Sequence, residues 1–260
     1  MTSDSPVQPV SPLHDSPPAR TIVLWGDCRA GKTTVLTTAF FGEPSRLPEI
    51  DRQASANTLS QHIFPDWQRL HRGRAVRPGG AAPRELVFMG SDGHPIRIVE
   101  LPGQWAGQLQ DPEVRRWLQA ADAILFAVAW GAPDADHIFS AISGASSLCQ
   151  NRPKALVFTR TECSLPEESA AWNRPESWWQ AHPWSMAHAE VIARFAPAVW
   201  PVSAYGYHAE SGYPAVLIGK FGQLLPHGIR PRNVSAPFEW LMNQMPSWSI
   251  PPLRPPVEAQ

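Results

Sequence analysis

The most chemically specific residues of the chain lie near its start, in the segment GDCRAGKT at residues 26–33. The segment fits the pattern G-x-x-x-x-G-K-[ST], in which backbone N–H groups of the loop converge on phosphate oxygens and the following helix adds a favourable dipole. Lys32 is expected to neutralise the charge of the β- and γ-phosphates, and the Thr33 hydroxyl to ligate Mg²⁺. We therefore predict a nucleoside triphosphate site made of Gly26, Asp27, Cys28, Arg29, Ala30, Gly31, Lys32, Thr33 and Thr34.

A second polar group, the segment ELPGQ at residues 100–104, follows an apolar run with strand character. A carboxylate at such a point can hold Mg²⁺, and the N–H of a glycine just beyond it can contact the γ-phosphate. A glutamine beside that glycine is placed to orient a hydrolytic water. The two segments together predict Thr33 and Glu100 as metal ligands, Gly103 as a phosphate contact, and Lys32 and Gln104 as catalytic residues.

These side chains need strands that end at one edge of a sheet. Apolar runs rich in β-forming residues predict strands at 21–25, 123–130, 155–159 and 198–202, and apolar periodicity predicts helices at 32–41, from 111, from 133, at about 185–195 and at 236–244. The Asp92-Gly93 pair between the runs 84–90 and 95–101 predicts an antiparallel hairpin with a type I′ turn. Alternating strands and helices imply right-handed crossovers. The predicted fold class is α/β: a three-layer P-loop domain whose mostly parallel sheet has one antiparallel hairpin strand.

The remaining segments are less regular. Apolar residues between 59 and 70 keep helical spacing, and Pro65 is expected to split or kink that helix, whereas residues 76–83 are rich enough in Gly and Pro to predict a loop. Many of the 29 prolines crowd the two ends of the chain. Such segments bury too little apolar surface to offset their ordering entropy. We therefore predict disordered tails at 1–19 and 246–260 around a single domain at 20–245.

Bulk composition argues against several classes of partner. The formal net charge is -1 and charged residues make up 17%, so neither nucleic acid nor an anionic membrane is indicated as a partner. No apolar run reaches membrane length. Cys28, Cys149 and Cys163 show neither metal nor disulfide spacing, which suits a reducing cytosol, and we expect a cytoplasmic protein. The tryptophans at 178, 179 and 184 are predicted to cover a small core, with a partner-binding patch as the alternative.

In this order, the phosphate loop, the hairpin and the segment 100–104 resemble the GTPases of the translation-factor-related class, which includes the Ras-like small GTPases. Thr159-Arg160-Thr161-Glu162 is similar to the base-recognition motif of that class, [Asn/Thr]-Lys-x-Asp, and Ser203-Ala204 is similar to its Ser-Ala loop. The resemblance implies that Thr159, Arg160 and Glu162 bind guanine, with Arg160 stacked on the base and Glu162 accepting its hydrogen bonds. Backbone N–H groups of Ser203 and Ala204 would support the base.

The same resemblance implies GTP or GDP as the ligand, Mg²⁺ as the cofactor, hydrolysis of GTP as the activity and a protein effector or regulator as the partner. The overall pattern is most similar to bacterial GTPase-like proteins of the double-GTPase kind, which are associated with conflict or signalling systems. The resembling motifs span residues 21–204, and the segment 205–245 is related only loosely.

Several positions depart from that pattern. Glu100 stands where many members have Asp, and Cys28 and Arg29 occupy loop positions that are glycine in Ras-like members. The loop at 78–83 offers no threonine for the first switch, and Thr58 lies in a predicted helix, which makes it a poor substitute. These departures predict slow or partner-dependent hydrolysis. Two alternatives stay open: a nucleotide-gated interaction module that does not hydrolyse, and an ATP-using P-loop protein, against which the hairpin argues.

Overall fold

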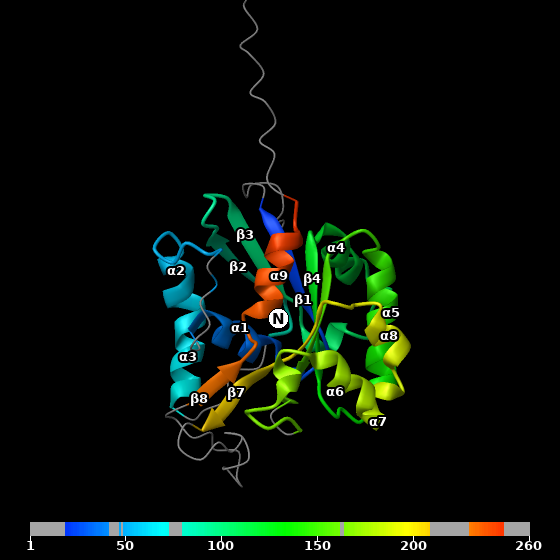
Figure 1. Ribbon diagram of the computed structural model, residues 1–260. Coiled ribbons are helices and arrows are strands. Elements are labelled where there is room, and N and C mark those ends of the chain that lie inside the picture. The colour runs from blue at the N-terminus through cyan, green and yellow to red at the C-terminus, as the bar shows by residue number, and fades with distance from the viewer. Residues whose placement is uncertain are drawn as a thin grey trace, which may run out of the picture.

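The computed structural model describes residues 19–41, 47, 49–72, 80–161, 164–208 and 229–246. Within them, a six-stranded sheet has the order β2-β3-β1-β4-β5-β6 (Figure 1). Neighbouring strands run parallel except β2, which is antiparallel to β3. The strands are β1 (Arg20–Trp25), β2 (Arg84–Met89), β3 (Pro95–Glu100), β4 (Ala123–Ala129), β5 (Lys154–Thr159) and β6 (Val199–Pro201). This sheet confirms the predicted α/β class with one antiparallel hairpin strand.

Helices cover both faces of the sheet (Figure 1). One face packs against α1 (Lys32–Phe41) and α9 (Ala236–Gln244), and the other against α4 (Pro112–Ala120), α5 (Ala135–Leu148), α6 (Pro175–Ala181), α7 (Pro183–Met186) and α8 (Ala189–Ala193). In β1, Ile22 belongs to the first core and its neighbour Val23 to the second, as the two-residue period of a strand requires. Burying each such side chain contributes about 1.5–3 kcal/mol. The result is a three-layer domain with β1 at its centre.

A helical segment between α1 and β2 crosses the edge of the sheet. It consists of α2 (Ala56–Thr58), a π-helical turn (Leu59–Ile63) and α3 (Phe64–His71), with Pro65 in the first turn of α3. The helix is not broken at Pro65, because Ile63 and Phe64 keep helical dihedral angles. The local disturbance expected there takes the form of the π-helical turn just before Pro65, which has no N–H group to donate. At the edge strand β2, the Asp51 N–H donates to the Met89 carbonyl at 2.8 Å and the Thr58 hydroxyl donates to the Val87 carbonyl at 2.6 Å.

Two predictions about turns and helices were wrong in detail. At the hairpin, Gly93 has φ 78° but Asp92 does not have positive φ, and the Gly93 N–H donates to the Gly90 carbonyl at 2.9 Å. The connection is therefore a type I-like turn over residues 90–93 that ends in a left-handed glycine. The last hydrogen bond between the two arms of the hairpin runs from the Gly90 N–H to the His94 carbonyl. The helix expected at 185–195 is broken between α7 and α8, because His188 leaves helical geometry and stacks on Phe139.

A second sheet was not predicted. β7 (Ser203–His208) pairs with β8 (Ile229–Arg232) in an antiparallel ribbon separate from the main sheet. Of the tryptophans between 178 and 184, Trp179 is buried, and Trp178 stacks on Trp130 with ring centroids 3.9 Å apart. Trp184 contacts the same Trp130 ring, which supports core packing over a partner-binding patch. Apart from Ala19 and Pro246, the two proposed tails lie outside the described residues.

Candidate nucleotide-binding site

The loop between β1 and α1 lies at the carboxyl edge of the sheet. Gly26 passes so close to β4 that a Cβ there would lie 2.3 Å from the Ala127 carbonyl oxygen, which requires glycine. Arg29 has φ 62°, and the Val35 N–H donates to the Gly31 carbonyl at 2.9 Å as the helix begins. The strand, glycine-bounded loop and helix therefore stand in the order that a phosphate-binding loop requires.

Lys32 folds back inside this loop. Its Nζ donates to the Gly26 carbonyl at 2.7 Å and to the Asp27 carbonyl at 3.1 Å, and the residue is buried. Burial lowers the pKa of the Lys32 ammonium, and the nearby carboxylates of Glu100 and Asp27 and the Cys28 thiol partly offset that effect. A poorly solvated cation of this kind attracts a phosphate ligand strongly, because little water screens its charge.

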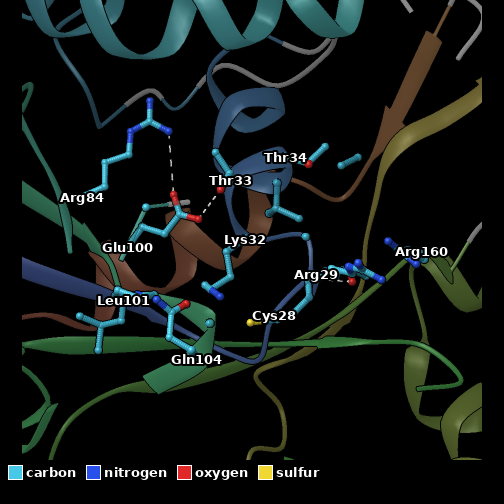
Figure 2. Close-up of a pocket in the computed structure, with 18 of the residues that line it drawn as sticks. Cys28, Arg29, Lys32, Thr33, Thr34, Arg84, Glu100, Leu101, Gln104 and Arg160 are labelled. Atoms are coloured by element: carbon cyan, nitrogen blue, oxygen red, sulfur yellow. Dashed lines mark hydrogen bonds and ion pairs between the residues drawn. The ribbon is translucent and has the colours of Figure 1, made fainter. Parts of the chain in front are cut away.

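Glu100 reaches the start of α1. It ends β3 in parallel register with Leu24 of β1, and its Oε1 accepts a hydrogen bond from the Thr33 hydroxyl (Figure 2). Its other oxygen, Oε2, is buried without a hydrogen bond, and the nearest cation, Arg84 Nη1, lies 3.9 Å away. Burial raises the pKa of the Glu100 carboxyl, while the Thr33 hydrogen bond and the charges of Lys32 and Arg84 lower it in part.

These residues fit Mg²⁺. The ion prefers oxygen ligands and is usually held by one or two protein groups together with substrate phosphates. Thr33 and Glu100 place a hydroxyl and a carboxylate together, and the Glu100 side chain is long enough to contact Thr33 directly. Oε2 is a buried acceptor without a hydrogen bond, and a bound cation would supply it with a close partner. Mg²⁺ held there would neutralise charge on the phosphates.

The segment after Glu100 touches the phosphate loop. A Cβ on Gly103 would lie 2.5 Å from both the N and the Cα of Cys28, so the two backbones are in direct contact. Gln104 follows in a short 3₁₀ turn (Gly103–Trp105), is exposed, and lines the same cavity as Lys32. The structure thus brings Glu100, Gly103 and Gln104 to the phosphate loop, as their order in the sequence predicts.

The end of β5 is tied to two other parts of the site. The Thr159 hydroxyl donates to the Ala30 carbonyl of the phosphate loop at 2.9 Å, and the Thr161 hydroxyl donates to the Val202 carbonyl beyond β6 at 3.0 Å. Arg160, between them, has φ 60° and is exposed at the cavity, on the same side of the pocket as Arg29 in Figure 2. Glu162 lies outside the described residues.

The Ser203-Ala204 pair is only partly at the cavity. Ala204 lines it, but Ser203 is fully buried behind, and its hydroxyl accepts a hydrogen bond from the Gly206 N–H at 2.8 Å. Ser203 therefore supports, through its side chain, the register irregularity of β7 between Ser203 and Tyr207. The next residue, Tyr205, also lines the cavity. Sequence reasoning missed Tyr205, since nothing at that position marks a ligand contact.

The cavity has a volume of about 550 Å³. Of the residues assigned to the site, these line it: Cys28, Arg29, Ala30, Gly31, Lys32, Thr33, Thr34, Glu100, Gly103, Gln104, Thr159, Arg160 and Ala204. Gly26 and Asp27, the first two residues of the loop, do not line the cavity, and their carbonyls accept hydrogen bonds from Lys32. Thr58 does not line the cavity.

Arg84 lines the cavity and was also missed. The hairpin register pairs Arg84 with Glu100, and directly opposed residues of an antiparallel pair point to the same face. Counting back from the turn at 91–94 would have placed Arg84 beside Glu100, so a signal for it was present in the sequence.

Fold and site together define a three-layer α/β domain in which a glycine-bounded loop with the sequence pattern of a phosphate-binding loop joins β1 to α1. No family model matches the chain, and no curated protein matches it in sequence. Among solved structures, the chain is similar to LeoA, a bacterial dynamin GTPase from ETEC, with 16% sequence identity and a TM-score of 0.43. The match covers 71% of this chain and 30% of LeoA, so the chain spans less than a third of that protein. Among the described residues, no helix has both the length and the apolar character needed to cross a membrane.

Proposed function

We propose that this chain binds GTP and GDP with Mg²⁺ and hydrolyses GTP slowly, as a nucleotide-dependent switch. The observation that carries the proposal is the contact between the Thr33 hydroxyl and the Glu100 carboxylate, next to a buried Lys32. It joins the phosphate loop to a metal-type carboxylate from a different strand. Preference for guanine follows from the resemblance of residues 159–162, and we propose that Glu162 accepts hydrogen bonds from the base.

Each residue has a distinct role in this proposal. Lys32 and the loop N–H groups hold the β- and γ-phosphates and stabilise the charge that develops on them. Thr33 and Glu100 hold Mg²⁺. Gln104 is exposed at the cavity, where it orients a water molecule for attack. Arg160 stacks on the base, and Ala204 supports it. Catalysis of this type is positioning and charge stabilisation rather than covalent chemistry.

Nucleotide titration tests the binding part. We expect GTP and GDP to bind and ATP to compete weakly, and Lys32→Ala to weaken binding at least 100-fold, since a charge-assisted contact to phosphate is lost. Equal competition by ATP and GTP would contradict the guanine preference and favour an ATP-using protein. No binding of any nucleotide would refute the proposal.

Single-turnover hydrolysis tests the enzymatic part. We expect slow release of phosphate by the wild type and a loss of about 100-fold in Gln104→Ala, at the lower end of what a positioned acid–base group contributes. Gln108→Ala is the matched control, since Gln108 is exposed nearby and does not line the cavity. Nucleotide binding with no hydrolysis in either protein would favour the alternative of a non-hydrolysing interaction module, which the absence of a threonine among residues 80–83 also favours.

We further propose that residues 20–245 act as one nucleotide-binding domain in a bacterial defence or signalling setting, with a protein effector that reads its nucleotide state. The proposal is that the domain works in the cytoplasm, and that neither nucleic acid nor a membrane is its target. The support is the near-neutral charge of the chain, -1, and the resemblance of its motifs. Copurification with GTP-loaded and GDP-loaded protein tests it: a partner that binds both forms equally would contradict a switch.

A further inference from the structure

Arg84 stands between the proposed metal site and the helical segment that crosses the sheet edge. It begins β2, directly opposite Glu100. Its Nη1 lies 3.1 Å from Asp66 Oδ2 on α3 and 3.9 Å from Glu100 Oε2, and its Nη2 donates to the His62 carbonyl in the π-helical turn. Figure 2 shows the Arg84 guanidinium directed at one oxygen of the Glu100 carboxylate, while Thr33 contacts the other.

One guanidinium therefore serves two buried carboxylates. Asp66 is 8% exposed and Glu100 is 5% exposed, so neither can rely on water to stabilise its charge. Of the two carboxylates, only that of Asp66 is within hydrogen-bond distance of Arg84, and Glu100 Oε2 has no hydrogen bond. The arrangement is unequal: Asp66 holds the cation, while Glu100 has an ion pair at the limit of contact.

A divalent cation at Thr33 and Glu100 would meet Arg84 as a like charge. The two cations compete for the same carboxylate, and their repulsion in a poorly solvated site is strong. Arg84 can give up its contact with Glu100 because it already has a closer ion pair with Asp66, at 3.1 Å. Metal binding at Glu100 thus strengthens the hold of Asp66 and the His62 carbonyl on Arg84.

We propose that Arg84 is an internal competitor for the proposed metal carboxylate Glu100. Its release from Glu100 when Mg²⁺ binds leaves it paired with Asp66 alone, and this couples the metal site to α3 and the preceding π-helical turn. The inference rests on the proposed binding of nucleotide with Mg²⁺. It identifies Arg84 as a positioning residue and the segment 56–71 as the part of the domain that responds to metal occupancy.

The two charges predict opposite effects of mutation. Arg84→Gln removes the competitor and leaves Asp66 as an additional negative charge, so Mg²⁺ binds more tightly. Asp66→Asn removes the alternative partner, so Arg84 moves onto Glu100 and Mg²⁺ binds more weakly. A merely structural pair would give the same direction in both variants, since each breaks the same ion pair.

The experiment uses the full chain loaded with a fluorescent GDP analogue and follows the rate of analogue release against the concentration of free Mg²⁺. We expect Arg84→Gln to lower the half-effective Mg²⁺ concentration roughly tenfold and Asp66→Asn to raise it by a similar factor; these values lie far below the unscreened Coulomb value because Arg84 is 26% exposed. The double variant should return toward the wild type. Arg20→Gln is the matched control, since Arg20 also begins a strand and pairs with a carboxylate, Asp92, away from the cavity.

Hydrogen exchange gives a second readout that does not depend on release. In the wild type, Mg²⁺ should increase protection of the amides of residues 59–68, and in Arg84→Gln it should not. Shifts of the Mg²⁺ requirement in the same direction in both single variants, or no shift in either, would refute the coupling. If the wild type does not bind the analogue at all, the proposed function fails, whereas binding without opposite shifts overturns only the role of Arg84.

Discussion

The contact between Gly103 and the phosphate loop allows a quantitative prediction for Gly103→Ala. The new methyl group would stand 2.5 Å from the N and Cα of Cys28 and 2.8 Å from the carbonyl carbon of Asp27, whereas ordinary contacts of a Cβ begin near 3.4 Å. All three atoms are backbone, so no flexible side chain can move aside. The loop and the 3₁₀ turn must separate by roughly an ångström, and overpacking of this kind costs about 1–3 kcal/mol.

We expect this cost to appear mainly in nucleotide binding, because the displaced atoms belong to the loop that is proposed to hold the phosphates. Since 1.4 kcal/mol corresponds to a factor of ten, we expect nucleotide affinity to fall about 5- to 150-fold. Equilibrium titration with a fluorescent nucleotide measures the effect, and circular dichroism confirms that the variant is folded.

Gly107→Ala is the matched control for this prediction. A Cβ there would lie 3.2 Å from His137 Cε1, an atom at the end of a side chain that can shift. We expect its affinity to stay within twofold of the wild type. A folded Gly103→Ala protein that also binds within twofold of the wild type would refute the reasoning, since it would mean that the loop tolerates the displacement or does not hold the nucleotide.

Three further outcomes are expected. Thr159→Val removes the hydrogen bond to the Ala30 carbonyl. Because a buried acceptor then loses its partner, we expect the free energy of unfolding, measured by urea denaturation, to fall by about 1–3 kcal/mol. An unchanged value would show that the hydrogen bond contributes nothing. Burial raises the pKa of the Cys149 thiol to about 11 from 9.0, so the unfolded chain loses its proton first and stability should fall between pH 9 and about 11. Comparison of unfolding in wild type and Cys149→Ala should show the steeper fall in the wild type, and parallel curves would contradict it. Cys28 is exposed at the cavity, so a maleimide should label it faster than buried Cys149, and bound nucleotide should protect it; labelling at the same rate with and without nucleotide would place the ligand elsewhere.

The parts of the fold that the sequence predicted well depend on local patterns. β1 and α1 follow from an apolar run, a glycine and a helical repeat within residues 20–41, and their bounds differ from the prediction by at most a residue. The capping of α4 was also local, since Asp111 accepts hydrogen bonds from the N–H groups of Glu113 and Val114. Such features need no knowledge of which distant segments meet.

The parts that were missed depend on distant pairs. β7 and β8 join residues 203–208 to 229–232, and neither strand has a strong alternating pattern that would reveal the pairing. The ion pair of Arg84 with Asp66 requires the position of α3 against β2, which no periodicity gives. The π-helical turn at 59–63 keeps nearly helical apolar spacing, so the pattern indicated a helix without revealing the extra residue in its turn.

In the site, backbone order alone accounts for which of the candidate residues lie together, while their roles stay predictions. Parallel strands end at one edge, so Glu100 and Thr159 were expected near Lys32 and are found there. Ser203 shows the limit of that argument, since the chain turns after β6 and buries the hydroxyl under Gly206. Which side of a turn faces a ligand depends on packing that the sequence order does not specify.

The segment that crosses β2 has a consequence for the behaviour of the protein at high concentration. An open edge strand offers a row of unpaired donors and acceptors to a second chain, and such edges promote aggregation. Here the outer side of β2 is hydrogen-bonded to the helical segment and the chain just before it. The Met89 carbonyl accepts from the Asp51 N–H, the Met89 N–H donates to the Ser55 hydroxyl, and the Val87 carbonyl accepts from the Thr58 hydroxyl. Ile50 also forms a β-bridge with Gly90. Residues 50–58 therefore block intermolecular strand pairing at this edge. If they detached from β2, the exposed strand could pair with other chains in a fibre-like assembly.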